Sequence, residues 1–132
     1  MRKKVFIADG DKETLVYFKK LLTAHGYEVL AASDDRELLE KCENFEPHVV
    51  LLDTQLGGTD GFRLCQKIKS DHRIKDCIVV LMSNINQEEM WKEHFYEFGA
   101  SSLLQKPINS QILLTIIESH FPLPQTTVEY DY

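Results

Sequence analysis

Two aspartates follow two short apolar runs, and both are placed where a carboxylate could do chemistry. Asp53 follows the run Val49–Leu52 and precedes a short, uncharged loop, while Asp9 follows the run Val5–Ala8. An uninterrupted apolar run of this kind is typical of a strand buried on both faces of a parallel sheet. Parallel α/β sheets place ligands and reacting groups just outside the carboxyl ends of their strands. Asp53 is therefore the first candidate for a reacting side chain.

The elements that must position these aspartates alternate regularly along the chain. The pattern predicts strands at residues 4–8, 27–31, 49–52, 77–82 and 102–105. It predicts helices that start near residues 11, 33, 60, 86 and 109 and end near 24, 46, 68, 98 and 121. Asp11 is a good N-cap for the first helix, and Gly26 and Gly99 suit the ends of the first and fourth.

This alternation predicts an α/β fold with a doubly wound parallel sheet. Right-handed crossovers leave few arrangements of five strands and five helices. The flavodoxin-like order 2-1-3-4-5 has its switch point between strands one and three, whose carboxyl ends carry Asp9 and Asp53. The two carboxylates are therefore expected to face each other.

Composition limits the function classes. The 132 residues suit one domain, and the net charge of −6 argues against a nucleic-acid surface, which needs clustered Lys and Arg. The apolar run after the basic start is too short for a signal peptide, and no later run approaches a membrane span. We expect a cytoplasmic protein whose Cys42, Cys65 and Cys77 are reduced, semi-buried thiols.

The whole of residues 4 to about 121 resembles the receiver domain of two-component response regulators. Five features match that family in order and in their positions at strand ends. They are the acid Asp9, the strand-three aspartate Asp53, the helix start Asp60-Gly61, the hydroxyl of Ser83 and the pair Lys106-Pro107. Together they identify residues 1–121 as a receiver domain, followed by a tail or the start of a linker at 122–132.

The resemblance implies a phosphoacceptor. A histidine kinase or a phosphotransfer protein would donate a phosphoryl group to Asp53, and Lys106 and the Ser83 hydroxyl would contact the phosphoryl oxygens. Alternatively, the Ser83 hydroxyl could form a hydrogen bond to nearby backbone. The Lys106-Pro107 bond is a candidate cis peptide. The domain would be a signalling domain rather than an enzyme, with at most self-phosphorylation and self-dephosphorylation at Asp53.

The resemblance also implies a magnesium ion, since charge on the phosphoryl oxygens must be offset during transfer. Its ligands here would be Asp9, Asp53 and the backbone carbonyl of Gln55. The family usually has a second acid directly after the first, and this chain has Gly10 there. Asp11 could replace the lost charge, although capping the first helix is the favoured role. We therefore expect weak magnesium binding.

Two further departures concern access and switching. Asn84 follows Ser83 where the family prefers a very small residue, and Leu103 takes the place of the aromatic residue whose rotation usually reports phosphorylation. An output domain or partner is expected at the face formed by helix four, strand five and helix five. If Trp91 or Tyr96 is exposed there, it becomes a candidate anchor for a partner.

Two alternatives remain open. A phosphorylation-independent pseudo-receiver, acting as a protein-binding module, is favoured by Gly10, Asn84 and Leu103 and opposed by Asp53, Ser83 and Lys106. A flavin-binding enzyme of the flavodoxin type would need a loop rich in Ser, Thr and Gly after strand one, and residues 10–13 are acidic instead. The sequence does not identify the kinase, the output or the oligomeric state.

Overall fold

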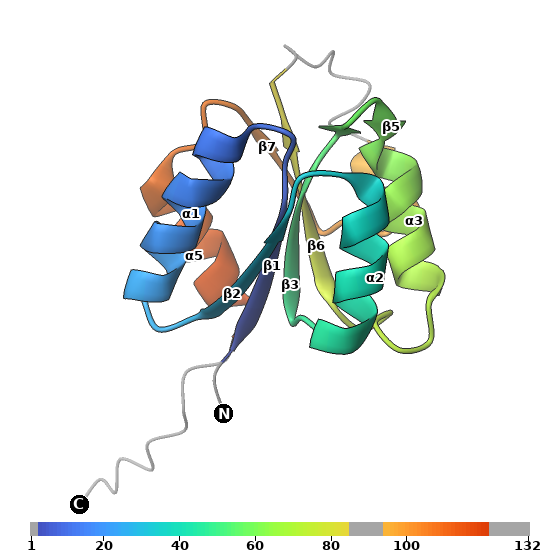
Figure 1. Ribbon diagram of the computed structural model, residues 1–132, viewed down its shortest axis with the longest axis horizontal. Coiled ribbons are helices and arrows are strands. Elements are labelled where there is room, and N and C mark those ends of the chain that lie inside the picture. The colour runs from blue at the N-terminus through green and yellow to red at the C-terminus, as the bar shows by residue number, and fades with distance from the viewer. Residues whose placement is uncertain (1–2, 85–93, 122–132) are drawn as a thin grey trace, which may run out of the picture.

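A five-stranded parallel sheet forms the centre of the molecule, with helices on both of its faces (Figure 1). This computed structural model describes residues 3–84 and 94–121. The strands of the sheet are β1 (Lys4–Ala8), β2 (Glu28–Ala32), β3 (Val49–Asp53), β6 (Ile78–Ser83) and β7 (Ser102–Gln105). The α-helices in the described residues are α1 (Lys12–Ala24), α2 (Asp35–Phe45), α3 (Gly61–Ser70) and α5 (Ser110–Ser119).

The strand order is β2-β1-β3-β6-β7, which confirms the predicted order 2-1-3-4-5. Each neighbouring pair is parallel, and the register pairs Ala8 with Leu52 and Asp53 with Met82. The carboxyl ends of β1 and β3 therefore lie side by side. Asp9 comes directly after the first of these strands, and Asp53 is the last residue of the second.

The sheet separates two apolar clusters. Helices α1 and α5 cover one face and α2 and α3 cover the other (Figure 1). In β3, Val49 and Leu51 pack into the α1/α5 cluster, whereas Val50 and Leu52 pack into the α2/α3 cluster. All four are fully buried, as predicted for a strand covered on both faces. Each such side chain contributes roughly 2 kcal/mol by leaving water, so β3 anchors the fold.

Four helices begin at a residue with a short polar side chain. The N-caps Asp11, Asp34, Asp60 and Asn109 each accept a hydrogen bond from a backbone N–H in the first turn of their helix. A cap of this kind contributes about 1 kcal/mol. These caps confirm the predicted roles of Asp11 and Asp60 and fix where each helix starts after the sheet edge.

The structure differs from the prediction in two segments. The loop after Asp53 contains a small antiparallel hairpin of β4 (Gln55–Leu56) and β5 (Thr59–Asp60), turned by Gly57 and Gly58 at φ 58° and 84°. The predicted fourth helix lies mostly outside the described residues. Its last part, Phe95–Phe98, is the 3-10 helix η1 rather than α-helix, and it ends at Gly99 with φ 95°.

The three cysteines are free, fully buried thiols in the α2/α3 cluster. Burial raises the pKa of the Cys42 and Cys65 thiols to about 12 and that of Cys77 to about 11. Because the thiolate is the reactive form, we expect almost no reaction with Ellman's reagent in the folded protein at pH 8. All three thiols should react in guanidinium chloride. Rapid labelling of a thiol without denaturant would contradict this burial.

Candidate functional site

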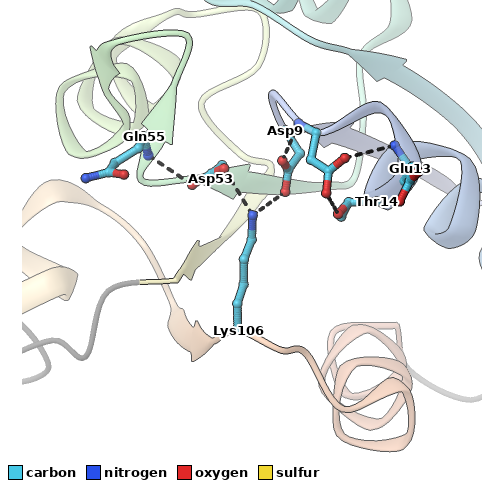
Figure 2. A network of polar contacts seen from close by, with 7 residues as sticks. Asp9, Glu13, Thr14, Asp53, Gln55 and Lys106 are labelled. Atoms are coloured by element: carbon cyan, nitrogen blue, oxygen red, sulfur yellow. Dashed lines mark hydrogen bonds and ion pairs between the residues drawn. The ribbon is translucent and has the colours of Figure 1, made fainter.

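Three charged side chains meet at the carboxyl edge of the sheet. The Lys106 ammonium donates to Asp9 Oδ2 at 2.6 Å and to Asp53 Oδ2 at 3.1 Å (Figure 2). Asp9 is 1% exposed and Asp53 is 7% exposed, so both contacts are largely shielded from water. The structure thus brings together Asp9, Asp53 and Lys106, three of the predicted site residues.

Strand alternation explains why these three side chains converge. Side chains two residues apart on a strand point to the same face of the sheet. Ile7, Leu51 and Leu104 all pack into the α1/α5 cluster, and Asp9, Asp53 and Lys106 stand two residues after them. All three charged groups therefore emerge on the α1/α5 side, from β1, β3 and the end of β7.

Backbone groups hold the remaining carboxylate oxygens. Asp9 Oδ1 accepts from the N–H of Asp11 at 2.9 Å, and Asp53 Oδ1 accepts from the N–H of Gln55 at 3.0 Å (Figure 2). Each of the four oxygens of the two carboxylates thus has a hydrogen-bond partner. Both side chains are fixed in one orientation by the loops that follow their strands.

Burial and neighbouring charges shift the ionisation of this cluster. Burial raises the pKa of Asp53, and the charge of Asp9 acts in the same direction, while hydrogen bonds from Gln55 and Lys106 oppose the rise. Burial alone would lower the pKa of Lys106, but its hydrogen bonds to Asp9 and Asp53 outweigh burial and raise it. Lys106 is consequently a cation throughout the neutral range.

Asp11 has a different role from Asp9 and Asp53. Its Oδ1 accepts from the N–H of Glu13 at 3.0 Å and its Oδ2 from the Thr14 hydroxyl at 2.9 Å. The Thr14 hydrogen bond is the main cause of a lowered pKa for this exposed carboxyl. The structure therefore gives Asp11 the capping role that the sequence favoured over a metal-binding role.

Gly10 leaves an opening where the second acid of the pattern would stand. A Cβ built on Gly10 would have only the Gly57 nitrogen within 4 Å, at 4.0 Å. Its backbone is outside the left-handed region, where Gly26, Gly57, Gly58 and Gly99 lie. Other residue types would fit at position 10, so the glycine is not required by the fold.

Ser83 ends β6, one residue after Met82, the register partner of Asp53. It is fully buried, and its carbonyl accepts the Lys106 N–H. This backbone hydrogen bond places Ser83 next to the lysine, and contact of its hydroxyl with a phosphoryl group stays a prediction. The Lys106-Pro107 peptide bond is cis, as predicted.

Gly61 is a residue whose main role the sequence did not reveal. It begins α3, and its N–H donates to the Thr54 carbonyl at 2.9 Å. A Cβ on Gly61 would lie 2.3 Å from the Asp53 carbonyl oxygen and 2.6 Å from Thr54 Cα. Only glycine allows α3 to start against the backbone that carries Asp53.

A groove beside Lys106 was also not predicted. It has a volume of about 310 Å³ and runs between α1 and the connection from β7 to α5, lined by Asp11, Glu13, Thr14, Tyr17, Phe18, Lys106, Pro107 and Ile108. The Tyr17 and Ser110 hydroxyls join α1 to α5 at 2.8 Å. Such a groove depends on the packing of distant segments, which no local pattern encodes.

The residues expected to take part in switching or in docking a partner differ in their exposure. Leu103 is half-buried against the α2/α3 cluster, Asn84 is exposed and Tyr96 is 60% exposed. Phe98 packs on Phe62, with ring centroids 5.0 Å apart. Trp91 lies outside the described residues.

The possible metal ligands at this edge of the sheet are of the chemical type that magnesium prefers. The Asp9 and Asp53 carboxylates and the Gln55 carbonyl all offer hard oxygen atoms. Within residues 3–84 and 94–121, no group of three His, Cys, Asp or Glu side chains could hold a metal ion. The site has few carboxylates because position 10 is glycine and because Asp11 caps α1.

Among residues 3–84 and 94–121, no helix is both long and apolar enough to cross a membrane.

The fold and the site together define a flavodoxin-like α/β domain, with an aspartate, a second acid and a lysine at the carboxyl edge of a five-stranded parallel sheet. The response regulator receiver domain family matches residues 5–118, and the chain belongs to this family. Phosphorylation on an aspartate and binding of Mg²⁺ at an acidic pocket are general for receiver domains.

Individual relatives agree with this assignment. The chain is 27% identical over 136 residues to the alkaline phosphatase synthesis transcriptional regulatory protein PhoP of Bacillus subtilis, covering 99% of this chain and 55% of that protein. It is 30% identical over 119 residues to the response regulator PleD of Caulobacter vibrioides, covering 90% of this chain and 26% of that protein. The chain thus spans about half or less of these relatives.

A solved structure supports the same fold. The CheY-like receiver domain protein from Methanospirillum hungatei superimposes with a TM-score of 0.81 at 28% identity, covering 90% of this chain and 93% of that one. The predicted flavodoxin-like receiver architecture is therefore confirmed.

Proposed function

We propose that this domain accepts a phosphoryl group on Asp53 from a histidine kinase or a phosphotransfer protein. The observation that carries the proposal is the contact of one lysine with both Asp9 and Asp53 at the carboxyl edge of the sheet. A carboxylate oxygen of Asp53 would form the new bond to phosphorus as the bond from phosphorus to the donor breaks. The product is an aspartyl phosphate, and the domain acts as a signalling switch rather than as a metabolic enzyme.

Lys106 is suited to follow the charge during this transfer. Its contact to Asp9 is shorter than its contact to Asp53, so the ammonium can exchange Asp53 for a phosphoryl oxygen while Asp9 still holds it. An ammonium is a mobile point charge, which suits such a change of partner. The Ser83 hydroxyl is the proposed donor to a second phosphoryl oxygen.

Asp9, Asp53 and the Gln55 carbonyl are the proposed ligands of Mg²⁺, with Asp11 as a fourth, less favoured one. When bound, the ion supplies positive charge that offsets the charge of the phosphoryl oxygens. Because the acidic pocket lacks a carboxylate at position 10, we propose that Mg²⁺ binds weakly.

The partners of the domain are proposed from its exposed surfaces. The groove between α1 and the connection before α5, which Lys106 lines, is the proposed contact site for the phosphodonor. Tyr96 and Ile112, 60% and 52% exposed, mark the proposed surface for an output domain or partner. We place this activity in the cytoplasm, in a domain that spans residues 1–121.

A direct test is the intact mass of the protein after treatment with acetyl phosphate, with and without Mg²⁺. We expect one phosphoryl adduct in the parent that depends on Mg²⁺ and is absent in Asp53→Asn. The Asp60→Asn variant is the matched control, because it changes an exposed capping carboxylate and should keep the adduct.

The second candidate is a pseudo-receiver that binds a partner without phosphate. Gly10 favours this candidate, since it removes an acid from the pocket. Absence of the adduct in the parent, even at high Mg²⁺, would reject the phosphoacceptor and leave the binding module.

A further inference from the structure

We propose that Thr59 and Asp35 are positioning residues for Asp53, because their hydrogen bond holds the β4–β5 hairpin where it fixes the Asp53 carboxylate. The inference rests on the proposed function in taking Asp53 as the phosphoacceptor. It goes beyond that function because it assigns a role in phosphoryl transfer to two side chains outside the cluster of Asp9, Asp53 and Lys106.

A side-chain hydrogen bond joins the hairpin to the first turn of α2. The Thr59 hydroxyl donates to Asp35 Oδ2 at 3.1 Å, and both side chains are half-buried. Thr59 lies opposite Leu56 in the hairpin register, and opposite residues of an antiparallel pair share one face. Leu56 is fully buried in the α2/α3 cluster. The hairpin therefore turns this face toward α2, where an apolar side chain and a hydroxyl both hold it.

The two ends of one peptide group depend on this hairpin. The Thr54 carbonyl accepts from the N–H of Gly61, which directly follows β5. The N–H of the same peptide group belongs to Gln55 and donates to Asp53 Oδ1 at 3.0 Å (Figure 2). Because a trans peptide group is planar, fixing the direction of its carbonyl also fixes the direction of its N–H. The place of β5 thus decides whether Asp53 Oδ1 keeps its donor.

This donor completes the orientation of the Asp53 carboxylate. Lys106 holds Oδ2 and the N–H of Gln55 holds Oδ1, so the plane of the carboxylate is set by two donors from different parts of the chain. Phosphoryl transfer requires the attacking oxygen to lie roughly in line with the bond that breaks. A carboxylate that turns more freely meets this requirement less often, so the rate constant of transfer falls.

The hairpin is short, so the loss of one side-chain contact has a large effect on its place. Each strand has two residues, and the turn between them contains Gly57 and Gly58, the residue type that restricts the backbone least. A ribbon of this length is not stable by itself. Leu56 holds the first strand and the Thr59 hydroxyl holds the second, which is the strand that leads into Gly61.

The first test is amide hydrogen exchange of the parent and of Thr59→Val, measured by NMR without metal or phosphodonor. Valine removes the hydroxyl and keeps a side chain of similar shape. We expect the Gln55 and Gly61 amides to exchange about tenfold faster in the variant. The Thr54 amide donates to the Met82 carbonyl in the sheet and should keep its rate. Unchanged exchange at Gln55 and Gly61 would overturn the proposal.

The second test is the rate of adduct formation with acetyl phosphate and Mg²⁺, at a temperature where circular dichroism shows each variant to be fully folded. We expect Thr59→Val and Asp35→Ala each to slow the reaction about fivefold. Thr59→Ser keeps the donor and Asp35→Asn keeps an acceptor, so both should react at nearly the parent rate. The matched control is Thr115→Val, which removes an exposed hydroxyl that donates to the Gln111 carbonyl in α5. Parent-like rates in Thr59→Val, or equal slowing in Thr115→Val, would contradict positioning by this hydrogen bond.

The double variant Thr59→Val/Asp35→Ala shows whether the two side chains act through each other. If they do, it should react no more slowly than either single variant. Slowing by the product of the two single effects would overturn the proposal. A parent that forms no adduct would reject the proposed function, while the exchange rates of Gln55 and Gly61 would still decide whether the hydrogen bond positions Asp53.

Discussion

Replacing Gly61 with alanine is expected to destabilise the protein by about 3 kcal/mol. The new methyl group would lie 2.3 Å from the Asp53 carbonyl oxygen and 2.6 Å from Thr54 Cα, both of which are backbone atoms that cannot turn aside. Either α3 must move away from the sheet or the end of β3 must shift. Chemical denaturation followed by circular dichroism measures the loss.

Gly10→Ala is the control for this substitution. Its methyl group would meet only the Gly57 nitrogen at 4.0 Å, which is an ordinary contact. We expect a change within about 0.5 kcal/mol, typical of a substitution that creates no clash. Equal losses in the two variants would show that the close approach of α3 to Asp53 is not the cause.

Replacing Gly10 with aspartate is expected to tighten Mg²⁺ binding at least tenfold. A carboxylate and a dication about 5 Å apart attract by about 7 kcal/mol at an effective dielectric near 20. Desolvation offsets most of this attraction. A remainder of about a fifth of the attraction is enough for a tenfold change in Kd. The backbone at position 10 accepts a Cβ without a clash.

Gly10→Asn separates charge from shape in this experiment. The amide has nearly the same size as the carboxylate and no charge, so its Kd for Mg²⁺ should stay within about threefold of the parent. Without metal, Gly10→Asp should be less stable than Gly10→Asn, because three carboxylates then share one ammonium. Tight binding by both variants would assign the effect to shape alone.

The sequence predicted the sheet because its strands are buried on both faces. The apolar runs that end at Asp9 and Asp53 have no polar residue to interrupt them, and their order followed from the alternation of strands and helices. The N-caps Asp11 and Asp60 were predictable for a similar reason, since an aspartate before an apolar periodic segment has few other uses.

The sequence was less informative about contacts between distant segments. Asp9 and Lys106 are far apart in the chain, and only the resemblance to receiver domains suggested that the lysine would reach this site. Nothing local indicated that its shorter contact would be with Asp9 rather than with Asp53. Gly61 was expected only as part of a helix start. The requirement for glycine comes from the nearby backbone of Asp53 and Thr54, which local patterns cannot describe.

The segment after Asp53 was also predicted only in part. The sequence predicted a short, uncharged loop, whereas the structure has a hairpin there with two residues in each strand. Hairpins this short gain little from strand pairing alone and depend on packing. Leu56, which is fully buried in the α2/α3 cluster, provides that packing.

Because side chains alternate along the strands, this site is sensitive to the insertion or deletion of a residue in a strand. It is much less sensitive to which apolar residues the strand contains. Asp9, Asp53 and Lys106 share one side of the sheet because each stands two residues after a residue of the α1/α5 cluster. Exchanging one apolar residue for another in β1, β3 or β7 leaves this arrangement intact. Inserting or deleting a single residue in β7 would instead turn Lys106 to the α2/α3 face of the sheet. The ammonium would then be separated from both carboxylates, while the hydrophobic composition stays nearly the same.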